Sequence, residues 1–338
     1  MPFIDQIIRY SSLSVVGLGK NTGKTECLRY ITRRLFTLNK VMAITSVGID
    51  GEAIDRVTAT SKPEVLIEKG MYFTTVGSFY LQKRFTAEIC HVEKSQTVLG
   101  KMITARALER GTLVLAGPSD TLSLQRWIHN TSAKYPVDIC LVDGAVSRLS
   151  PASPAVTESM VLTTGAAFSA NIKTLVAGTR FVYDTIQLPA VPEEIRKPLE
   201  NITKGIRTIT EDGQIEDPGI DSALTPDQIR QVLDTCGNRI YIPGVLSNGL
   251  LKALTERKEA GKICLYVRDF SRIFAEPATF YAFLRKGGRM AQLLRPNLLA
   301  VCVNPVSPEG YCLRSEELVS HMQDALNISV YDIKNIKT

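Results

Sequence analysis

Near its start the chain reads Ser14-Val15-Val16-Gly17-Leu18-Gly19-Lys20-Asn21-Thr22-Gly23-Lys24-Thr25. This stretch predicts a short β-strand, a turn of small residues, and a helix that begins at Gly-Lys-Thr. Glycines allow several backbone N–H groups to converge on one anion, and a helix N-terminus adds partial positive charge. Lys24 can reach the β- and γ-phosphates of a nucleotide, and the Thr25 hydroxyl can coordinate Mg²⁺. The stretch therefore predicts a nucleoside-triphosphate site.

The spacing of the glycines departs from the usual phosphate-binding pattern, G-x-x-x-x-G-K-[ST]. That pattern requires glycine at position 18, which is Leu18 in this chain. The context nevertheless fits, because residues 13–16 have the pattern of a strand and residues 25–36 have apolar side chains at helical spacing. The alternative is a glycine-rich turn that binds no ligand.

The loop resembles those of two families of P-loop proteins. Residues 17–25 align without a gap with the G-T-D-T-x-V-G-K-T loop of dethiobiotin synthetases. Lys20 resembles the signature lysine of the MinD and ParA ATPases, although it lies four residues before Lys24 instead of five. Lys20 is therefore either a phosphate contact or a solvated surface lysine. The resemblance implies that the nucleotide contacts come from Gly19, Lys20, Asn21, Thr22, Gly23, Lys24, Thr25 and Glu26.

Two acidic residues at expected strand ends are the candidate partners of this loop. Ligands of parallel sheets gather at the carboxyl ends of strands, and a P-loop needs carboxylates to hold Mg²⁺ and position water. Asp143 ends the apolar run 139–142, the form of a Walker B strand, and its alternative role is a helix N-cap. Asp50 follows an expected strand at 40–48, and the resemblance implies that it helps to bind Mg²⁺ and orient water; the alternative is a turn aspartate. The candidate catalytic residues are Lys24 and Asp50, and the candidate metal ligands are Thr25, Asp50 and Asp143.

Asn304 follows another expected strand, at residues 298–303. In the resembled superfamily a base-contacting asparagine lies at this place, whereas Asn-Pro is also a common start of a turn. The guanine-binding motif [NT]-K-x-D is absent from the sequence, which favours ATP over GTP. The expected cofactors are thus ATP and Mg²⁺.

Expected strands and helices alternate along most of the chain, which is typical of an α/β protein. We predict a doubly wound, mostly parallel sheet with the P-loop after its first strand, and a C-terminal α/β extension. One further strand is expected at residues 113–119. The sequence pattern of alternating strands and helices changes over residues 188–234, which hold five prolines and an acidic patch. The expected organisation is a P-loop nucleotide-binding domain at 1–190, a connector or insertion at 191–235, and an α/β region at 236–338, which either stands alone or completes the same sheet.

Composition excludes several classes of protein. The 338 residues are 44% apolar and 22% charged, which is ordinary for a globular chain. The net charge of +6 comes without a long basic run and argues against a nucleic-acid binder. No apolar stretch is long enough for a membrane span, and no signal peptide is expected. Seven scattered cysteines without C-x-x-C spacing indicate buried thiols in a reducing cytoplasm.

A combination of motifs suggests a particular role. Gly-Lys-Asn-Thr-Gly-Lys-Thr at 19–25, Asp-Gly-Ala at 143–145 and Ser-Pro-Ala-Ser-Pro-Ala-Val-Thr at 150–157 occur together. They resemble a clostridial-type family associated with adenosylcobalamin-dependent lysine 5,6-aminomutase, the small subunit of its ATP-dependent reactivating factor. This resemblance implies a chaperone-like activity in which ATP hydrolysis, with a second ATPase subunit, drives release of damaged cobalamin from the aminomutase.

Two other functions remain open on the residues alone. One is an ATP-dependent small-molecule ligase like dethiobiotin synthetase, with Lys20 as a second lysine near the phosphates. The other is a nucleotide-dependent switch without substrate chemistry. The sequence also leaves open whether the protein is a homodimer.

Overall fold

The computed structural model describes residues 3–48, 64–97, 99–145, 156–223, 226–235 and 237–336. The chain forms two compact units, one made of Met1–Thr179 and Pro296–Thr338 and the other of Arg180–Arg295. The chain thus leaves the first unit once and returns to it, a division that differs from the expected boundaries after residues 190 and 235. Among the described residues, no helix has the length and apolar character needed to cross a membrane.

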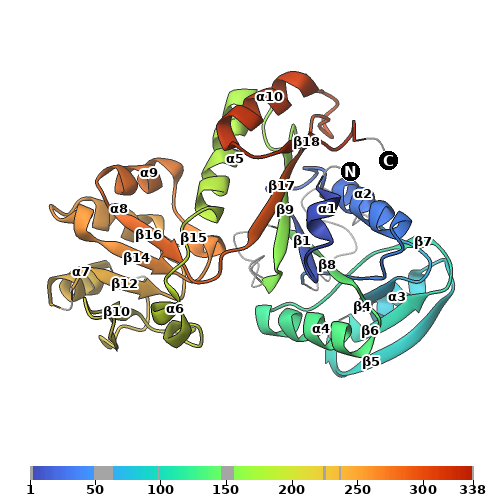
Figure 1. The fold of residues 1–338 in the computed structure, drawn as a ribbon, viewed down its shortest axis with the longest axis horizontal. Helices are drawn as coiled ribbons and strands as arrows, with labels where there is room; N and C mark the ends of the chain where they lie inside the picture. Colours follow the sequence, from blue (N-terminus) through green and yellow to red (C-terminus); the bar gives the residue numbers. More distant parts are fainter. Residues whose placement is uncertain are drawn as a thin grey trace. The chain divides into compact units, whose positions relative to one another are not determined.

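The first unit is built on a mixed sheet with nine described strands, in the order β18-β17-β9-β1-β8-β2-β4-β6-β5 (Figure 1). Neighbouring strands from β18 to β4 are parallel, and β6 is antiparallel to both β4 and β5. The protein is therefore α/β with a large mixed sheet. The strands are β1 (Ser12–Gly17), β2 (Met42–Ser46), β4 (Tyr72–Val76), β5 (Ala87–Thr97), β6 (Gly100–Ala107), β8 (Ile139–Ala145), β9 (Ser159–Gly165), β17 (Asn297–Asn304) and β18 (Val330–Asp332).

Helices cover both faces of this sheet because its central strands are apolar on both sides. Ile139 and Leu141 of β8 pack with residues of α1 and α2, whereas Cys140 and Val142 pack with α4 on the other face. This alternation follows from the period of two along a strand. The helices are α1 (Ile4–Ile7), α2 (Lys24–Thr37), α3 (Gly77–Gln82), α4 (Thr121–Lys134), α5 (Ile172–Ile186) and α10 (Ser315–Leu326), with the boundary between the units inside α5.

The prediction of a strand at residues 113–119 is wrong over most of that range. Strand β7 spans only Gly111–Leu113 and pairs with β3 (Val65–Ile67) in a separate two-stranded sheet. Beyond it, the hydroxyl of Thr75 donates to Val114 O at 3.0 Å and accepts from Ala116 N at 3.2 Å. One side chain therefore satisfies backbone groups that a neighbouring strand would otherwise pair.

The second unit has its own sheet and core. Its strands are in the order β11-β10-β12-β14-β16, with β12, β14 and β16 parallel and β10 antiparallel to both of its neighbours. The C-terminal region expected at 236–338 is thus divided, because β12 to β16 belong here while β17 and β18 extend the first sheet. The elements are α6 (Glu193–Leu199), β10 (Arg207–Ile209), β11 (Ile215–Glu216), α7 (Pro226–Thr235), β12 (Arg239–Ile242), β13 (Leu246–Ser247), α8 (Asn248–Thr255), β14 (Cys264–Val267), β15 (Ile273–Phe274), α9 (Pro277–Arg285) and β16 (Arg289–Gln292).

Candidate functional site

The glycine-rich loop joins the end of β1 to the start of α2. Asn21 and Gly23 both adopt left-handed backbone conformations, with φ of 59° and 91°. At Gly23 a Cβ atom would also lie 2.9 Å from the Cβ of Asn304, so the position requires glycine. These two residues turn the chain sharply before Lys24, the first residue of α2.

The N-terminus of α2 has no side-chain cap. Its N-cap residue is Gly23, which offers no side-chain acceptor. By contrast, Asp120 caps α4 by accepting from Ser123 N at 2.9 Å. The first N–H groups of a helix have no carbonyl partner within the helix, so those of α2 are available to an anion.

Strand β9 fixes the shape of the loop through hydrogen bonds made by Thr163. Thr22 is buried, and its hydroxyl donates to Gly19 O at 2.9 Å and lies 3.4 Å from Thr163 Oγ1. Leu18 N also donates to Thr163 O at 2.9 Å. Thr163 therefore holds both ends of the loop, a role that sequence reasoning missed.

Lys24 and Asp143 meet at the carboxyl edge of the sheet. Lys24 Nζ lies 2.9 Å from Asp143 Oδ1, and the two side chains are 25% and 12% exposed. Asp143 lies within β8, in register between Val15 of β1 and Ser46 of β2. A residue inside a strand is not the N-cap of a helix, so that alternative reading of Asp143 is wrong.

The carboxylate of Asp143 is suited to coordinate a metal ion. Its Oδ1 atom is buried and has no well-directed hydrogen bond in the described part of the chain, although Lys24 stands beside it. No cluster of three or more His, Cys, Asp or Glu side chains able to hold a metal occurs among the described residues. Mg²⁺ does not need such a cluster, since it binds through one or two carboxylates together with substrate phosphates and waters.

The remaining predicted contacts lie around this pair. Gly19, Lys20 and Asn21 are exposed at the tip of the loop, and Thr25 is half-buried in the first turn of α2. Glu26 lies 3.5 Å from Lys334 Nζ, an ion pair with the segment that follows β18. Asp50 lies outside the described residues.

Asn304, at the end of β17, braces the loop from the side. Its Nδ2 atom donates to Asn21 O at 3.3 Å, and its Oδ1 atom accepts from Val306 N at 3.2 Å. The second bond is the local turn that Asn-Pro is expected to start. The first joins a C-terminal strand to the tip of the phosphate-binding candidate loop. Contact with a nucleotide base stays a prediction.

An Asn304→Ala variant separates bracing from base recognition. Loss of the Asn21 contact should lower the free energy of unfolding by about 0.5–1.5 kcal/mol. It should weaken the binding of ATP and the binding of GTP equally, because the lost contact supports the loop and does not involve the base. Urea unfolding and calorimetric titration measure the two effects. The matched control is Asn297→Ala at the other end of β17, where Asn297 Nδ2 donates to Glu158 O at 2.7 Å. Selective loss of ATP binding would instead establish base contact and contradict a purely bracing role.

Helix α2 is also anchored on β17 by two buried thiols. Cys27 Sγ lies 3.7 Å from Cys302 Sγ. The hydrogen bond from Cys27, together with burial, raises the pKa of the Cys302 thiol well above its ordinary value. The Cys302 thiol therefore remains neutral where α2 packs on β17.

The chain matches no protein-family model, no curated protein and no solved structure.

Proposed function

We propose that the first unit binds ATP with Mg²⁺ at the loop between β1 and α2 and hydrolyses it. The observation that carries this proposal is the ion pair of Lys24 with Asp143. It joins the lysine of a glycine-rich strand-to-helix loop to an aspartate on the adjacent parallel strand. That pairing brings together the cation and the carboxylate that phosphoryl-transfer sites use.

We regard the loop as a P-loop and the sheet as doubly wound and mostly parallel. The unbroken parallel pairing from β18 to β4 supports this reading, as do the apolar clusters on both faces of β8.

Each residue has a distinct role in this proposal. The backbone of Gly19–Glu26 surrounds the phosphates, and Lys24 neutralises charge on the β- and γ-phosphates. Thr25 and Asp143 offer oxygen atoms for Mg²⁺, and Asp50 is the third expected ligand and the candidate for orienting water. The bound nucleotide and ion would supply the transferable phosphoryl group and its charge neutralisation.

We further propose that hydrolysis serves a reactivating factor for an adenosylcobalamin-dependent aminomutase, working with a second ATPase subunit. This step rests on the sequence resemblance alone. Its direct test is whether the protein, with ATP, restores activity to an aminomutase inactivated by damaged cobalamin. Restoration that is equal with and without ATP would contradict it.

The ATPase itself is tested with the protein alone. We expect ATP binding to be Mg²⁺-dependent and phosphate to be released without any added substrate, with release abolished by EDTA. Calorimetry and a phosphate-release assay measure the two properties. Release only after a small acid or amine is added would favour the ligase. Binding without release would favour the switch, and either result would overturn the hydrolase.

A further inference from the structure

Lys24 stands directly against the carboxylate that a metal ion would use. Its Nζ atom lies 2.9 Å from Asp143 Oδ1, and that oxygen is buried. An ammonium group in this position and a divalent cation bound to the same carboxylate would repel each other strongly, because both carry positive charge at close range. The carboxylate of Asp143 therefore serves one of the two cations at a time.

The aspartate is fixed in place, whereas the lysine is able to move. Asp143 lies inside β8, between Val15 of β1 and Ser46 of β2, and its carbonyl accepts from Val47 N at 3.1 Å. Lys24 carries its charge on a flexible four-carbon stem in the first turn of α2, and its side chain is partly exposed. A change of partners at this site is thus a movement of Lys24.

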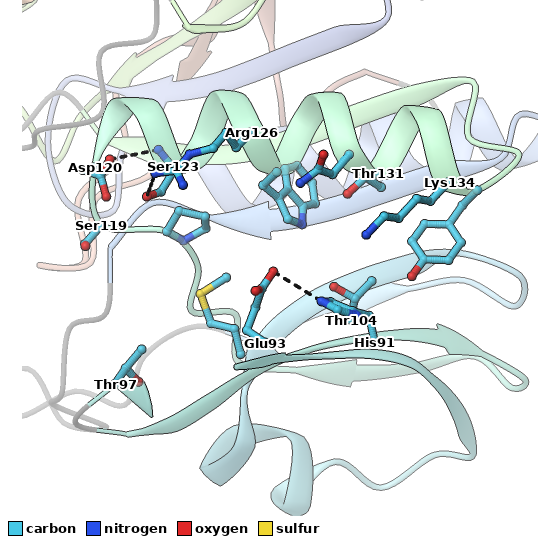
Figure 2. A pocket seen from close by; sticks show the side chains of 15 residues that line it. His91, Glu93, Thr97, Thr104, Ser119, Asp120, Ser123, Arg126, Thr131 and Lys134 are labelled. Carbon is cyan, nitrogen blue, oxygen red and sulfur yellow. Dashed lines mark hydrogen bonds and ion pairs between the residues drawn. The ribbon is translucent and has the colours of Figure 1, made fainter. Parts of the chain in front are cut away.

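Asp120 lies on a segment tied to the same edge of the sheet, but its carboxylate is engaged elsewhere. Pro118, two residues before it, accepts from Gly48 N at 2.9 Å. Asp120 itself caps α4 by accepting from Ser123 N at 2.9 Å. Figure 2 shows Asp120 and Ser123 together at the start of α4, where both line the cleft between α4 and the hairpin of β5 and β6. Lys24 thus keeps Asp143 as its partner within the part of the chain that the structure describes.

The contact between Lys24 and Asp143 is held by charge. Asp143 Oδ1 receives no well-directed hydrogen bond from the described residues. The strength of such a contact depends on the negative charge of the partner, and a triphosphate carries more of it than one carboxylate. The uncapped N-terminus of α2 would hold the phosphates within reach of Lys24. A bound nucleotide would therefore draw Lys24 away from Asp143.

We propose that Lys24 blocks the metal ligand Asp143 in the free protein and that a bound triphosphate removes the block. This inference rests on the proposed nucleotide site and adds an order of binding to it. Once Lys24 turns to the phosphates, Asp143 is a largely buried carboxylate without a cation, which is unfavourable. A divalent cation restores the balance of charge. The metal and the triphosphate therefore bind cooperatively, and each raises the affinity of the protein for the other by the same factor.

Mn²⁺ tests the block directly, because electron paramagnetic resonance follows its binding without nucleotide or turnover. Lys24→Met keeps most of the length of the side chain but removes its charge, and it should bind Mn²⁺ at least about tenfold more tightly than the wild type. Lys24→Gln should behave in the same way. Adding Asp143→Asn to either variant should abolish the gain, since the charged ligand is lost. Lys40→Met, which removes the lysine of the ion pair with Asp138, should bind Mn²⁺ as the wild type does.

A non-hydrolysable ATP analogue tests the release of the block. With the analogue, the wild type should bind Mn²⁺ at least about tenfold more tightly than without it. Equal affinity of the free wild type and both uncharged variants for Mn²⁺ would overturn the inference, even where the analogue binds. Failure of the proposed function would look different. The wild type would then not bind the analogue at any Mn²⁺ concentration, and release by a triphosphate would be overturned with it.

Discussion

A Lys24→Ala variant should lose at least tenfold in ATP affinity and about 10²–10³-fold in phosphate release. In the proposed complex the lysine donates to two phosphate groups, and a hydrogen bond to a charged group contributes about 1.5–3 kcal/mol. Removal of one preorganised donor from a reacting centre costs about 10²–10³ in rate. Calorimetric titration with a non-hydrolysable ATP analogue and Mg²⁺ measures the first effect, and steady-state phosphate release measures the second.

The chain supplies a matched control for this change. Lys40 Nζ lies 3.1 Å from Asp138 Oδ1. This ion pair precedes β2 and β8, at the amino ends of the strands, whereas Lys24 and Asp143 lie toward the carboxyl ends. Lys40→Ala removes the same type of contact between a lysine and an aspartate, but away from the loop. Its nucleotide affinity should equal that of the wild type. Unaltered affinity in Lys24→Ala would remove the basis of the proposed site.

Stability needs its own measurement, because Lys24→Ala leaves the partly buried Asp143 without its cation. We expect the single variant to lose about 1–3 kcal/mol of unfolding free energy, as for a buried polar group that loses its partner. The double variant with Asp143→Asn should recover part of that stability without recovering ATP binding. This pattern distinguishes a lost contact with nucleotide from a damaged fold.

Local pattern was sufficient to predict much of the first unit. The expected helix at 25–36 lies within α2, and the expected strands at 13–16 and 139–142 lie within β1 and β8. Each of these elements can be recognised from a short stretch of sequence, because the spacing of its apolar residues indicates a helix or a strand. The hairpin of β5 and β6 was not predicted, because β5 is an edge strand with exposed polar residues and lacks a strong alternating pattern.

The candidate site shows the same limit. Lys24, which follows the loop, and Asp143 of β8 were recognisable from their local motifs. Thr163 and Asn304 were not recognisable as loop supports, since their contacts with Thr22 and Asn21 span 141 and 283 positions in the sequence. Contacts of that separation depend on how strands are ordered in the sheet. No local pattern encodes the return of β17 after the whole second unit.

An Asp143→Asn variant should lower phosphate release by about 10²-fold or more while ATP binding in EDTA is kept or becomes tighter. Asparagine keeps the shape of the side chain but removes the charge that Mg²⁺ requires of its ligand. Without the metal, the carboxylate repels the triphosphate, so removing its charge favours the nucleotide. The variant should therefore reduce the ratio of ATP affinity measured with Mg²⁺ to that measured without it.

The control for this variant is Asp138→Asn, which changes an aspartate just before the same strand and should leave that ratio unaltered. Asp138 accepts from Val41 N at 2.7 Å and forms an ion pair with Lys40. Removing its charge therefore affects only contacts at the amino ends of the strands. Equal turnover of Asp143→Asn and wild type would show that the ion pair with Lys24 is structural. A proportional fall in binding with and without Mg²⁺ would likewise assign Asp143 to loop support and not to the metal. The change in the metal dependence of binding is the property that only a ligand to Mg²⁺ would produce.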